Sequence, residues 1–427
     1  MPDLTTGLPT LVHFLASAAI LAVCLRLDLR GTLSPIPFAS LVALDYLFFF
    51  SIFPALGDVL IAEMLVPVRM TPATIALTLG GEALLLGAFY AVQAVGSKRQ
   101  PFTLDISVTS AQLAVGWGAL AFAFAFDLFP MLRALPSLPQ MERPIWLAGA
   151  TVLFFAMINR RLGRIGSLLF VMAFVAKFAL LLRGGLASPA VSLCFVLASV
   201  LFVTRRWRLL AGIMALATIL VLSYVPIKRV HNLLEGRRVT SAADVTLGRD
   251  DGPASLYRSL MLVTRRSTQG LLLQHVIDKT PSQIPYWEGS TLVNLVTNNV
   301  PRFLWPNKPE ERLGNRFAAA YHLINDDDNE TSWNVPWLVE FYINFGRWGA
   351  LACMAAAGTV LGLVTRAITG RPLTVEHLAL AGAVVIPLFH TESNVSLLAG
   401  NLIWVALALL AGFALARRII PGPAAGA

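Results

Sequence analysis

Long apolar runs, separated by short polar segments, dominate the chain. A helix that spans a membrane needs about 20 mostly apolar residues, because lipid cannot hydrogen-bond to the backbone and the helix must pair its own polar groups. Eleven runs reach or approach this length, so the pattern predicts eleven transmembrane helices. Their ranges are 9–25, 38–62, 73–95, 106–129, 145–158, 165–182, 188–204, 209–226, 347–366, 375–391 and 395–416.

The predicted fold class is therefore all-α: a polytopic transmembrane helical bundle with one large, partly helical loop. It would comprise an N-terminal bundle of eight helices (1–226), the loop (227–346), three C-terminal helices (347–418) and a tail (419–427). The composition agrees, since 56% of the residues are hydrophobic, only 13% are charged and the mean hydropathy is +0.70. Soluble domains carry roughly a quarter charged residues, so this composition excludes an ordinary soluble protein.

Lys and Arg alternate between the two sets of connecting loops, and loops rich in these residues stay in the cytoplasm. One set holds fourteen of them and the opposite set only Arg69, Arg133, Arg143 and Arg183. The alternation predicts a multi-pass protein of the bacterial inner membrane with the large loop and the N-terminus outside and the C-terminus in the cytoplasm. The net charge of +9 follows from this asymmetry, so we expect no nucleic-acid partner. The three cysteines lie inside predicted spans and suggest neither disulfides nor a thiolate metal site.

The first half of the large loop carries a helical pattern between residues 253 and 280. Its apolar residues predict an amphipathic helix at the membrane surface, with Arg258, Arg265 and Arg266 on the polar side. These arginines would either bind an anionic ligand or reach toward lipid headgroups.

Three prolines stiffen the segment Val300 to Pro309, which carries Arg302, Trp305 and Lys308. A guanidinium offers a planar set of donors to phosphate oxygens, and an ammonium offers a point charge. Arg312 and Arg316 follow closely. The segment therefore predicts a binding site for an anionic ligand close to the membrane; the alternative is internal pairing of these cations with Glu310 and Glu311.

The acidic run from Asp326 to Glu330 suggests a hard metal ion, but it lacks the ligand spacing of a calcium loop. Such runs are usually solvated turns, and we predict no metal here.

A helix is predicted to begin at Pro336 and to continue without a break into the ninth span. It places Glu340, Asn344 and Arg347 on one face, which we expect to line a cavity rather than lipid. The alternative is that Glu340 and Arg347 tie the helix to its neighbours.

The turn between the tenth and eleventh spans is short and reads His390-Thr391-Glu392-Ser393-Asn394. His390 or Glu392 could act as a general base, although a polar turn at a membrane surface needs no function. Asp45, Glu82 and Lys177 lie within predicted spans. They should face the protein interior, where they could also form a structural ion pair.

Three segments of the chain, in this order, resemble the Wzy-type O-antigen and exopolysaccharide repeat-unit polymerases. They are Pro285-Tyr286-Trp287-Glu288-Gly289, then Pro301-Arg302-Phe303-Leu304-Trp305-Pro306-Asn307-Lys308-Pro309, then Glu340-Phe341-Tyr342-Ile343-Asn344-Phe345-Gly346-Arg347-Trp348-Gly349. The resemblance covers residues 255–365 at the level of motifs. It implies a membrane-embedded, inverting glycosyltransferase with a fold like the GT-C enzymes.

Such an enzyme would transfer a growing glycan from undecaprenyl diphosphate to a second lipid-linked repeat unit, without metal or other cofactor. The resemblance implies that Arg302, Lys308 and Arg265 or Arg266 neutralise the departing diphosphate. The reaction also needs a base for the acceptor hydroxyl, for which the sequence offers Glu392, His390 or Glu340. Further partners would be membrane lipid, a chain-length regulator and a flippase. Tyr286, Trp287, Trp305, Trp333 and Trp337 would contact sugar rings or form an interfacial aromatic belt.

Two other functions fit the same sequence. An O-antigen ligase would use the same donor with a different acceptor. A transporter or flippase would also need many spans and buried charges, but such proteins usually show internal repeats or broken helices, and the sequence suggests neither.

Overall fold

The computed structural model of the 427-residue chain describes most of its helices and part of the large loop. The described residues are 4–60, 69–95, 101–135, 138–183, 187–223, 227, 263–264, 267–300, 304–308, 312–325, 328–329 and 331–420.

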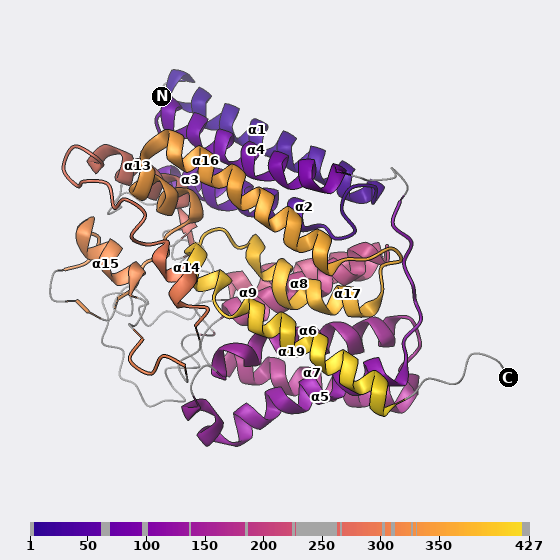
Figure 1. Ribbon diagram of the computed structural model, residues 1–427. Coiled ribbons are helices and arrows are strands. Elements are labelled where there is room, and N and C mark those ends of the chain that lie inside the picture. Colours follow the sequence, from indigo (N-terminus) through magenta and orange to yellow (C-terminus); the bar gives the residue numbers. More distant parts are fainter. Residues whose placement is uncertain are drawn as a thin grey trace, which may run out of the picture. The chain divides into compact units, whose positions relative to one another are not determined.

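The regular structure in these ranges is helical, apart from one isolated bridge between Leu104 and Leu373, and the predicted all-α class is confirmed (Figure 1). Within the described residues, eight helices are long and apolar enough to cross a membrane, and three shorter apolar helices accompany them. The eight are Leu8–Arg30, Phe38–Gly57, Pro72–Ala94, Ser110–Leu128, Pro139–Ile158, Gly163–Leu182, Trp337–Ile368 and Val395–Ile419, and the three are Pro189–Val203, Trp207–Leu222 and Val375–Phe389. All eleven predicted ranges are therefore largely helical.

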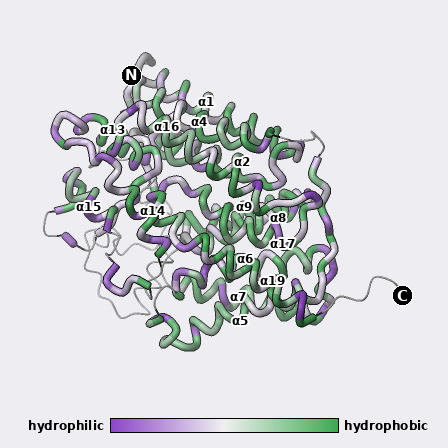
Figure 2. Tube along the Cα trace, viewed as in Figure 1, coloured by the Kyte–Doolittle hydropathy of each residue, from purple (hydrophilic) through white to green (hydrophobic). Residues whose placement is uncertain are grey.

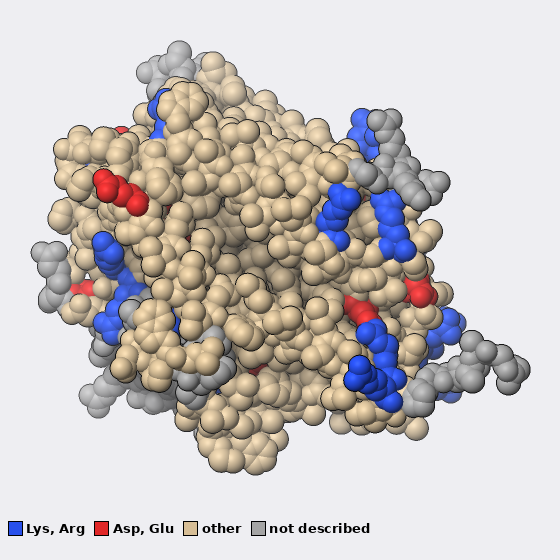
Figure 3. Space-filling model, in the orientation of Figure 1, with Lys and Arg blue, Asp and Glu red and all other residues tan. Residues whose placement is uncertain are grey.

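The helices expose more apolar side chains than the surface of a soluble protein usually carries. Figure 2 shows hydrophobic residues along the helices and hydrophilic ones mainly in the connecting segments. Large areas of the face drawn in Figure 3 carry no charged side chain. On α7 (Gly163–Arg183), Ile165, Leu168 and Met172 are all at least 60% exposed. Exposed apolar surface of this extent is typical of contact with lipid, and the chain is a multi-pass membrane protein.

The chain divides into two compact units. Unit 1 comprises Met1–Phe102, Arg265–Arg371 and Pro387–Val405, and unit 2 comprises Thr103–Thr264, Pro372–Ile386 and Ala406–Ala427.

Unit 1 is built around α4 (Pro72–Ala94) and α16 (Trp337–Ile368), which lie side by side (Figure 1). Gly358 packs against the backbone of Leu85, and a Cβ there would overlap the Leu85 carbonyl oxygen. Gly362 lies close to Phe89 and Val92 in the same way. Small residues four apart let two helix backbones approach each other within a membrane, so these glycines fix the pairing of α4 with α16.

The two ends of this helix pair differ in chemistry. At one end Arg366 donates to the carbonyl oxygens of Val92 and Val95, the last residues of α4. At the other end the side chain of Gln274, in α13 (Gln269–Lys279), accepts from the Thr71 N–H and the Thr74 hydroxyl at the start of α4. The two helices therefore run parallel, with the arginine at one end and the described loop elements at the other.

The remaining described elements of unit 1 are helices and helix fragments. They are α1 (Leu4–Arg30), α2 (Phe38–Tyr46), the π-helix η1 (Leu47–Ile52), α3 (Phe53–Leu60), α14 (Val293–Thr297), α15 (Leu313–Ala320) and α18 (Val395–Ala399).

The prediction of an unbroken helix from Pro336 into the ninth span is wrong, because α16 is interrupted at Gly346. This residue has φ 68° and ψ −168°, a conformation that is essentially restricted to glycine. Leu338 and Met354 both contact Gly81, although sixteen residues of straight helix would separate them by about 24 Å. The segment before Gly346 therefore folds back beside the segment that follows it.

Other apolar helices are interrupted as well, so the expectation that broken helices are absent is also wrong. The second predicted span contains the π-helix η1 between α2 and α3. The tenth passes from α17 (Val375–Leu380) through the π-helix η3 (Ala381–Val385) to the 3₁₀-helix η4 (Ile386–Phe389). Gly400 and Asn401 separate α18 from α19 (Leu402–Ile419), where Asn401 has φ 65°.

Unit 2 contains the helices α5 (Ser110–Leu128), α6 (Pro139–Ile158), α7, α8 (Ala187–Val203) and α9 (Trp207–Leu222), with η2 (Pro130–Ala134) and α17. Helix α6 is the most enclosed, since eleven consecutive residues from Trp146 to Ala156 are buried. Gly149 allows it to approach Gly116 and Ala119 of α5 closely.

Candidate functional site

The turn between η4 and α18 places His390 between two carboxyl groups of unit 1. Its Nε2 lies 2.6 Å from Glu392 Oε1, and its Nδ1 lies 3.6 Å from Asp45 Oδ1. Asp45 projects from α2, and its Oδ2 accepts hydrogen bonds from the Thr391 N–H at 3.2 Å and from the Thr391 hydroxyl at 2.7 Å. The short polar turn is therefore anchored to a helix more than 340 residues earlier in the chain.

The charge state of His390 follows from these neighbours. Burial lowers the pKa of its imidazole, but the charges and hydrogen bonds of Glu392 and Asp45 outweigh burial and raise that pKa to about 10. At neutral pH the ring is therefore an imidazolium and has no free site for another proton. This favours Glu392 or Glu340 over His390 as the general base.

Glu340 joins the same turn from the first segment of α16. Its side chain is fully buried, and its Oε2 accepts from the Val395 N–H at 2.9 Å. The Trp337 N–H donates to the Thr391 carbonyl oxygen at 3.0 Å. The start of α16 and the His390–Asn394 turn therefore lie together.

Asn344 is the second polar residue predicted on this helix, and it connects three parts of unit 1. Its Oδ1 accepts from the Gly289 N–H at 2.8 Å, while its Nδ2 donates to Thr291 Oγ1 at 2.8 Å and to the Glu340 carbonyl oxygen at 2.7 Å. Arg347, predicted on the same face, is exposed instead, because the break at Gly346 separates it from Glu340 and Asn344.

At the break, two of the three motifs that carry the polymerase resemblance, the one at residues 285–289 and the one that begins at Glu340, come into contact. The Ile343 carbonyl oxygen accepts from the Trp287 N–H at 2.9 Å. A Cβ at Gly346 would lie 2.8 Å from the Tyr286 hydroxyl, so this ring packs on the glycine. Two segments some 55 residues apart in sequence thus form one structure beside Glu340.

Lys308, in the proline-rich motif, is bound to the turn that follows α14. Its Nζ donates to the carbonyl oxygens of Asn298 and Val300, each at 3.2 Å. Trp404 donates from Nε1 to the Asn299 carbonyl oxygen at 2.7 Å, which fixes the same turn to the start of α19. Trp305 is 40% exposed.

The predicted arginine cluster is described only in part. Arg312, at the start of α15, and Arg316, within it, are exposed, and the Arg316 guanidinium lies 4.7 Å from the centre of the Trp287 ring. Arg265, Arg266 and Arg302 lie outside the described residues, as does most of the predicted helix between 253 and 280.

The acidic run is likewise described only at Asp328 and Asn329. Asp328 accepts from the Thr331 N–H at 2.8 Å, and its carbonyl oxygen accepts from Asn315. These contacts form a turn. Within the described ranges, no group of three His, Cys, Asp or Glu side chains is arranged to hold a metal ion.

The buried ionisable residues separate into two environments. Lys177 lies within unit 2, where its Nζ is 2.7 Å from both Asp127 and Glu142. The partners of Lys177 are therefore Asp127 and Glu142, and neither Asp45 nor Glu82 was needed to pair with it. Asp127 and Glu142 stand near the ends of apolar runs, where charged residues are common, so the sequence alone did not mark them as partners of Lys177.

Glu82, in α4, is fully buried, and neither of its carboxyl oxygens has a hydrogen-bond partner in the described part of the chain. It lies close enough to Asp45 for their charges to interact. The sequence predicted that Glu82 is buried, but it did not show that no described residue donates a hydrogen bond to its carboxyl group.

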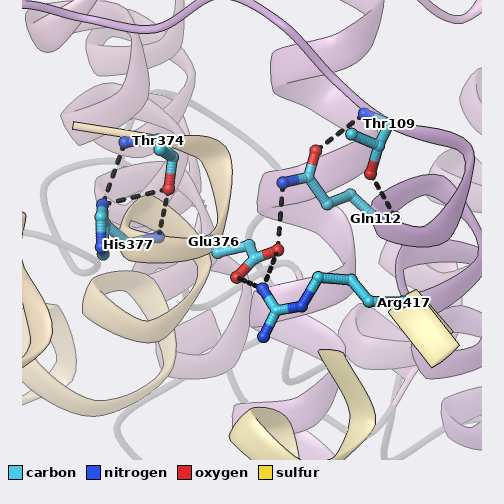
Figure 4. A network of polar contacts seen from close by, with 6 residues as sticks. All are labelled: Thr109, Gln112, Thr374, Glu376, His377 and Arg417. Atoms are coloured by element: carbon cyan, nitrogen blue, oxygen red, sulfur yellow. Dashed lines mark hydrogen bonds and ion pairs between the residues drawn. The ribbon is translucent and has the colours of Figure 1, made fainter. Parts of the chain in front are cut away.

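Unit 2 has a polar site of its own, a groove of about 520 Å³ beside the starts of α5 and α17. Glu376 accepts from Arg417 with both oxygens, at 2.9 and 2.7 Å, and from Gln112 at 3.1 Å (Figure 4). The helix caps Thr109 and Thr374 complete the network through Gln112 and His377. Because these groups satisfy one another, the groove is more typical of a structural network than of a catalytic site.

The fold and the site define a polytopic all-α membrane protein with a buried acidic centre. The chain belongs to the family DUF8712, a domain of unknown function, whose model matches residues 49–370, three quarters of its length. The matched range includes Glu82 and Glu340 and ends before His390 and Glu392. No curated protein and no solved structure matches the chain.

Proposed function

We propose that the protein is a glycosyltransferase that polymerises undecaprenyl-diphosphate-linked oligosaccharide repeat units, with its large loop on the periplasmic side of the bacterial inner membrane. The observation that carries this proposal is the assembly of two motifs of the polymerase pattern, 285–289 and 340–349, through the Trp287–Ile343 and Gly289–Asn344 hydrogen bonds. This assembly stands beside the Glu392–His390–Asp45 chain.

The chemistry of glycan transfer needs a base for the acceptor hydroxyl and positive charge where the diphosphate departs. Glu392 is the best candidate for the base, because its side chain is 12% exposed whereas Glu340 is fully buried. The imidazolium of His390 holds the Glu392 carboxylate in place. Arg302 and Lys308 are the candidates for the diphosphate, with Arg312 and Arg316 further out and Arg265 or Arg266 as additional cations.

The test is polymer formation by the purified full-length protein in lipid nanodiscs supplied with undecaprenyl-diphosphate-linked repeat units. Glu392→Gln should lower the rate by about 10² to 10⁴-fold, the usual contribution of a general base. The matched control is Glu376→Gln, which removes a carboxylate from the unit 2 network and should leave the rate near that of the wild type. Equal rates for Glu392→Gln and the wild type would exclude Glu392 as the base. If Arg302→Ala and Lys308→Ala also retained the full rate, the proposed diphosphate site would be wrong.

A transporter or flippase of lipid-linked oligosaccharides is the second candidate, and the interrupted helices favour it. Transporters place their substrate sites where helices are broken within the membrane, and unit 1 has interrupted helices at Gly346 of α16 and between α18 and α19. A fluorescent lipid-linked repeat unit in vesicles distinguishes the two functions. Movement across the bilayer without any longer glycan would support transport and contradict the polymerase. When a lipid A core acceptor is added to the same vesicles, a ligase would transfer the glycan to that acceptor.

A further inference from the structure

Glu82 is the one carboxyl group of unit 1 whose burial the described contacts leave unexplained. It lies at the middle of α4 with no exposed surface, and neither oxygen accepts a hydrogen bond from a described residue. An ionised carboxylate is very costly to bury without a counter-charge or donors. Among the described residues of unit 1, Glu82 forms no ion pair with Lys, Arg or His.

The groups that surround Glu82 come from each helix packed against α4. Asp45 and Tyr46 of α2 and Cys24 of α1 are close enough to interact with its charge. From α13, Gln274 bonds to Thr71 and Thr74 instead, and from α16, Glu340 bonds to the Val395 N–H. The Tyr46 hydroxyl is also buried without a hydrogen-bond partner in the described chain. No described neighbour therefore supplies the positive charge that an ionised Glu82 needs.

Asp45, unlike Glu82, has both hydrogen-bond donors and a positively charged neighbour among the described residues. It accepts two hydrogen bonds from Thr391 and lies 3.6 Å from the His390 ring. When two carboxyl groups lie near each other in unequal surroundings, the better solvated one keeps the charge and the other takes the proton. Of the two, Asp45 is therefore the better stabilised as a carboxylate.

We propose that Glu82 is a proton-binding site of unit 1, which exchanges its proton with the outer turn through Asp45, His390 and Glu392. The chain leads from a fully buried carboxyl group to one whose side chain is 12% exposed. The His390 imidazolium releases its Nδ1 proton to Asp45, and after the ring turns, the deprotonated nitrogen takes a proton from Glu392. Asp45 protonates Glu82 whenever Glu82 has released its own proton. Only O–H and N–H bonds form and break, and the total charge is unchanged.

This site goes beyond the proposed function, because a bound proton would serve either candidate activity. In a polymerase, proton exchange along this chain would return Glu392 to its carboxylate form after it has taken the proton of the acceptor hydroxyl. In a transporter, it would couple movement to a proton gradient. The position of Glu82 within the membrane-spanning α4 suits both.

Infrared spectroscopy of the full-length protein in lipid tests the proposal without any glycan substrate, so its result is independent of the activity assay. At neutral pH the wild type should show a carboxylic acid C=O band that Glu82→Gln lacks and that the control Glu376→Gln keeps. If Glu82→Gln does not fold, Glu82→Asp replaces it and should shift the band. Loss of carboxylate bands in Glu82→Gln, or no change of the acid band in either Glu82 variant, would overturn the proposal.

The pathway of exchange needs a second variant. In heavy water the acid band moves as its proton exchanges, and His390→Ala should slow this exchange at least tenfold while the band itself remains. Exchange at the wild-type rate in His390→Ala would exclude the route through the turn.

Discussion

At the scale of single residues, unit 1 holds four ionisable groups in place by giving each a specific partner. His390 lies between Glu392 and Asp45, Asp45 accepts from Thr391, and Glu340 accepts from the Val395 N–H. The sequence located each of these residues but not their pairing. Asp45 and Thr391 are 346 residues apart, and no local pattern encodes a contact over that distance.

From the raised pKa of His390 we predict how the stability of the folded protein depends on pH. Its pKa is about 10 in the folded protein against 6.5 for a free histidine, so folding favours the protonated ring. The stabilisation is therefore fully present below pH 6.5 and is lost as the pH rises through about 10. Thermal unfolding in detergent should show His390→Gln less stable than the wild type at pH 6.5 and nearly equal above pH 10.

The exposed His322 provides the control. His322→Gln should follow the wild type across the same pH range. A stability difference for His390→Gln that stayed constant up to and beyond pH 10 would contradict the charged ring.

At the scale of elements, hydropathy predicted where helices form but not where they break. Each apolar run became helical because its backbone must be satisfied within the membrane. Whether a glycine in such a run continues the helix or interrupts it depends on packing. Gly358 lies within the regular part of α16, whereas Gly346 of the same helix has positive φ and contacts Tyr286. Only the Tyr286–Gly289 segment, which is distant in sequence, distinguishes the two.

The break gives a second prediction. Gly346→Ala adds a Cβ 2.8 Å from the Tyr286 hydroxyl, at a φ that other residues rarely adopt, and strain of this kind costs about 1–3 kcal/mol. The variant should unfold at a lower temperature in detergent. Gly87→Ala in α4 is the matched control, since a Cβ at Gly87 meets no atom within 4 Å. Should Gly346→Ala unfold no earlier than Gly87→Ala, the break is not a requirement of the fold.

At the scale of the whole molecule, membrane residence and the family are established, while the sides of the membrane are an inference from charge. The apolar helices carry long exposed faces, which the composition already indicated. The parallel pair of α4 and α16 adds a structural constraint, because Arg366 and the described loop elements lie at opposite ends of it. If the arginine-rich end is cytoplasmic, the loop and its motifs must face outward.

Cysteine labelling tests this orientation. In a variant with Cys24, Cys194 and Cys353 replaced by alanine, a single cysteine at the exposed Asn307 reports on the loop and one at the exposed Arg418 reports on the end of α19. A maleimide that cannot cross membranes, applied to cells whose outer membrane has been made permeable, should label Asn307→Cys at once. Arg418→Cys should react only after the inner membrane is opened. The reverse order would place the loop in the cytoplasm. A cytoplasmic loop could not polymerise glycans on the periplasmic side, so this result would exclude the proposed polymerase regardless of the chemistry at Glu392.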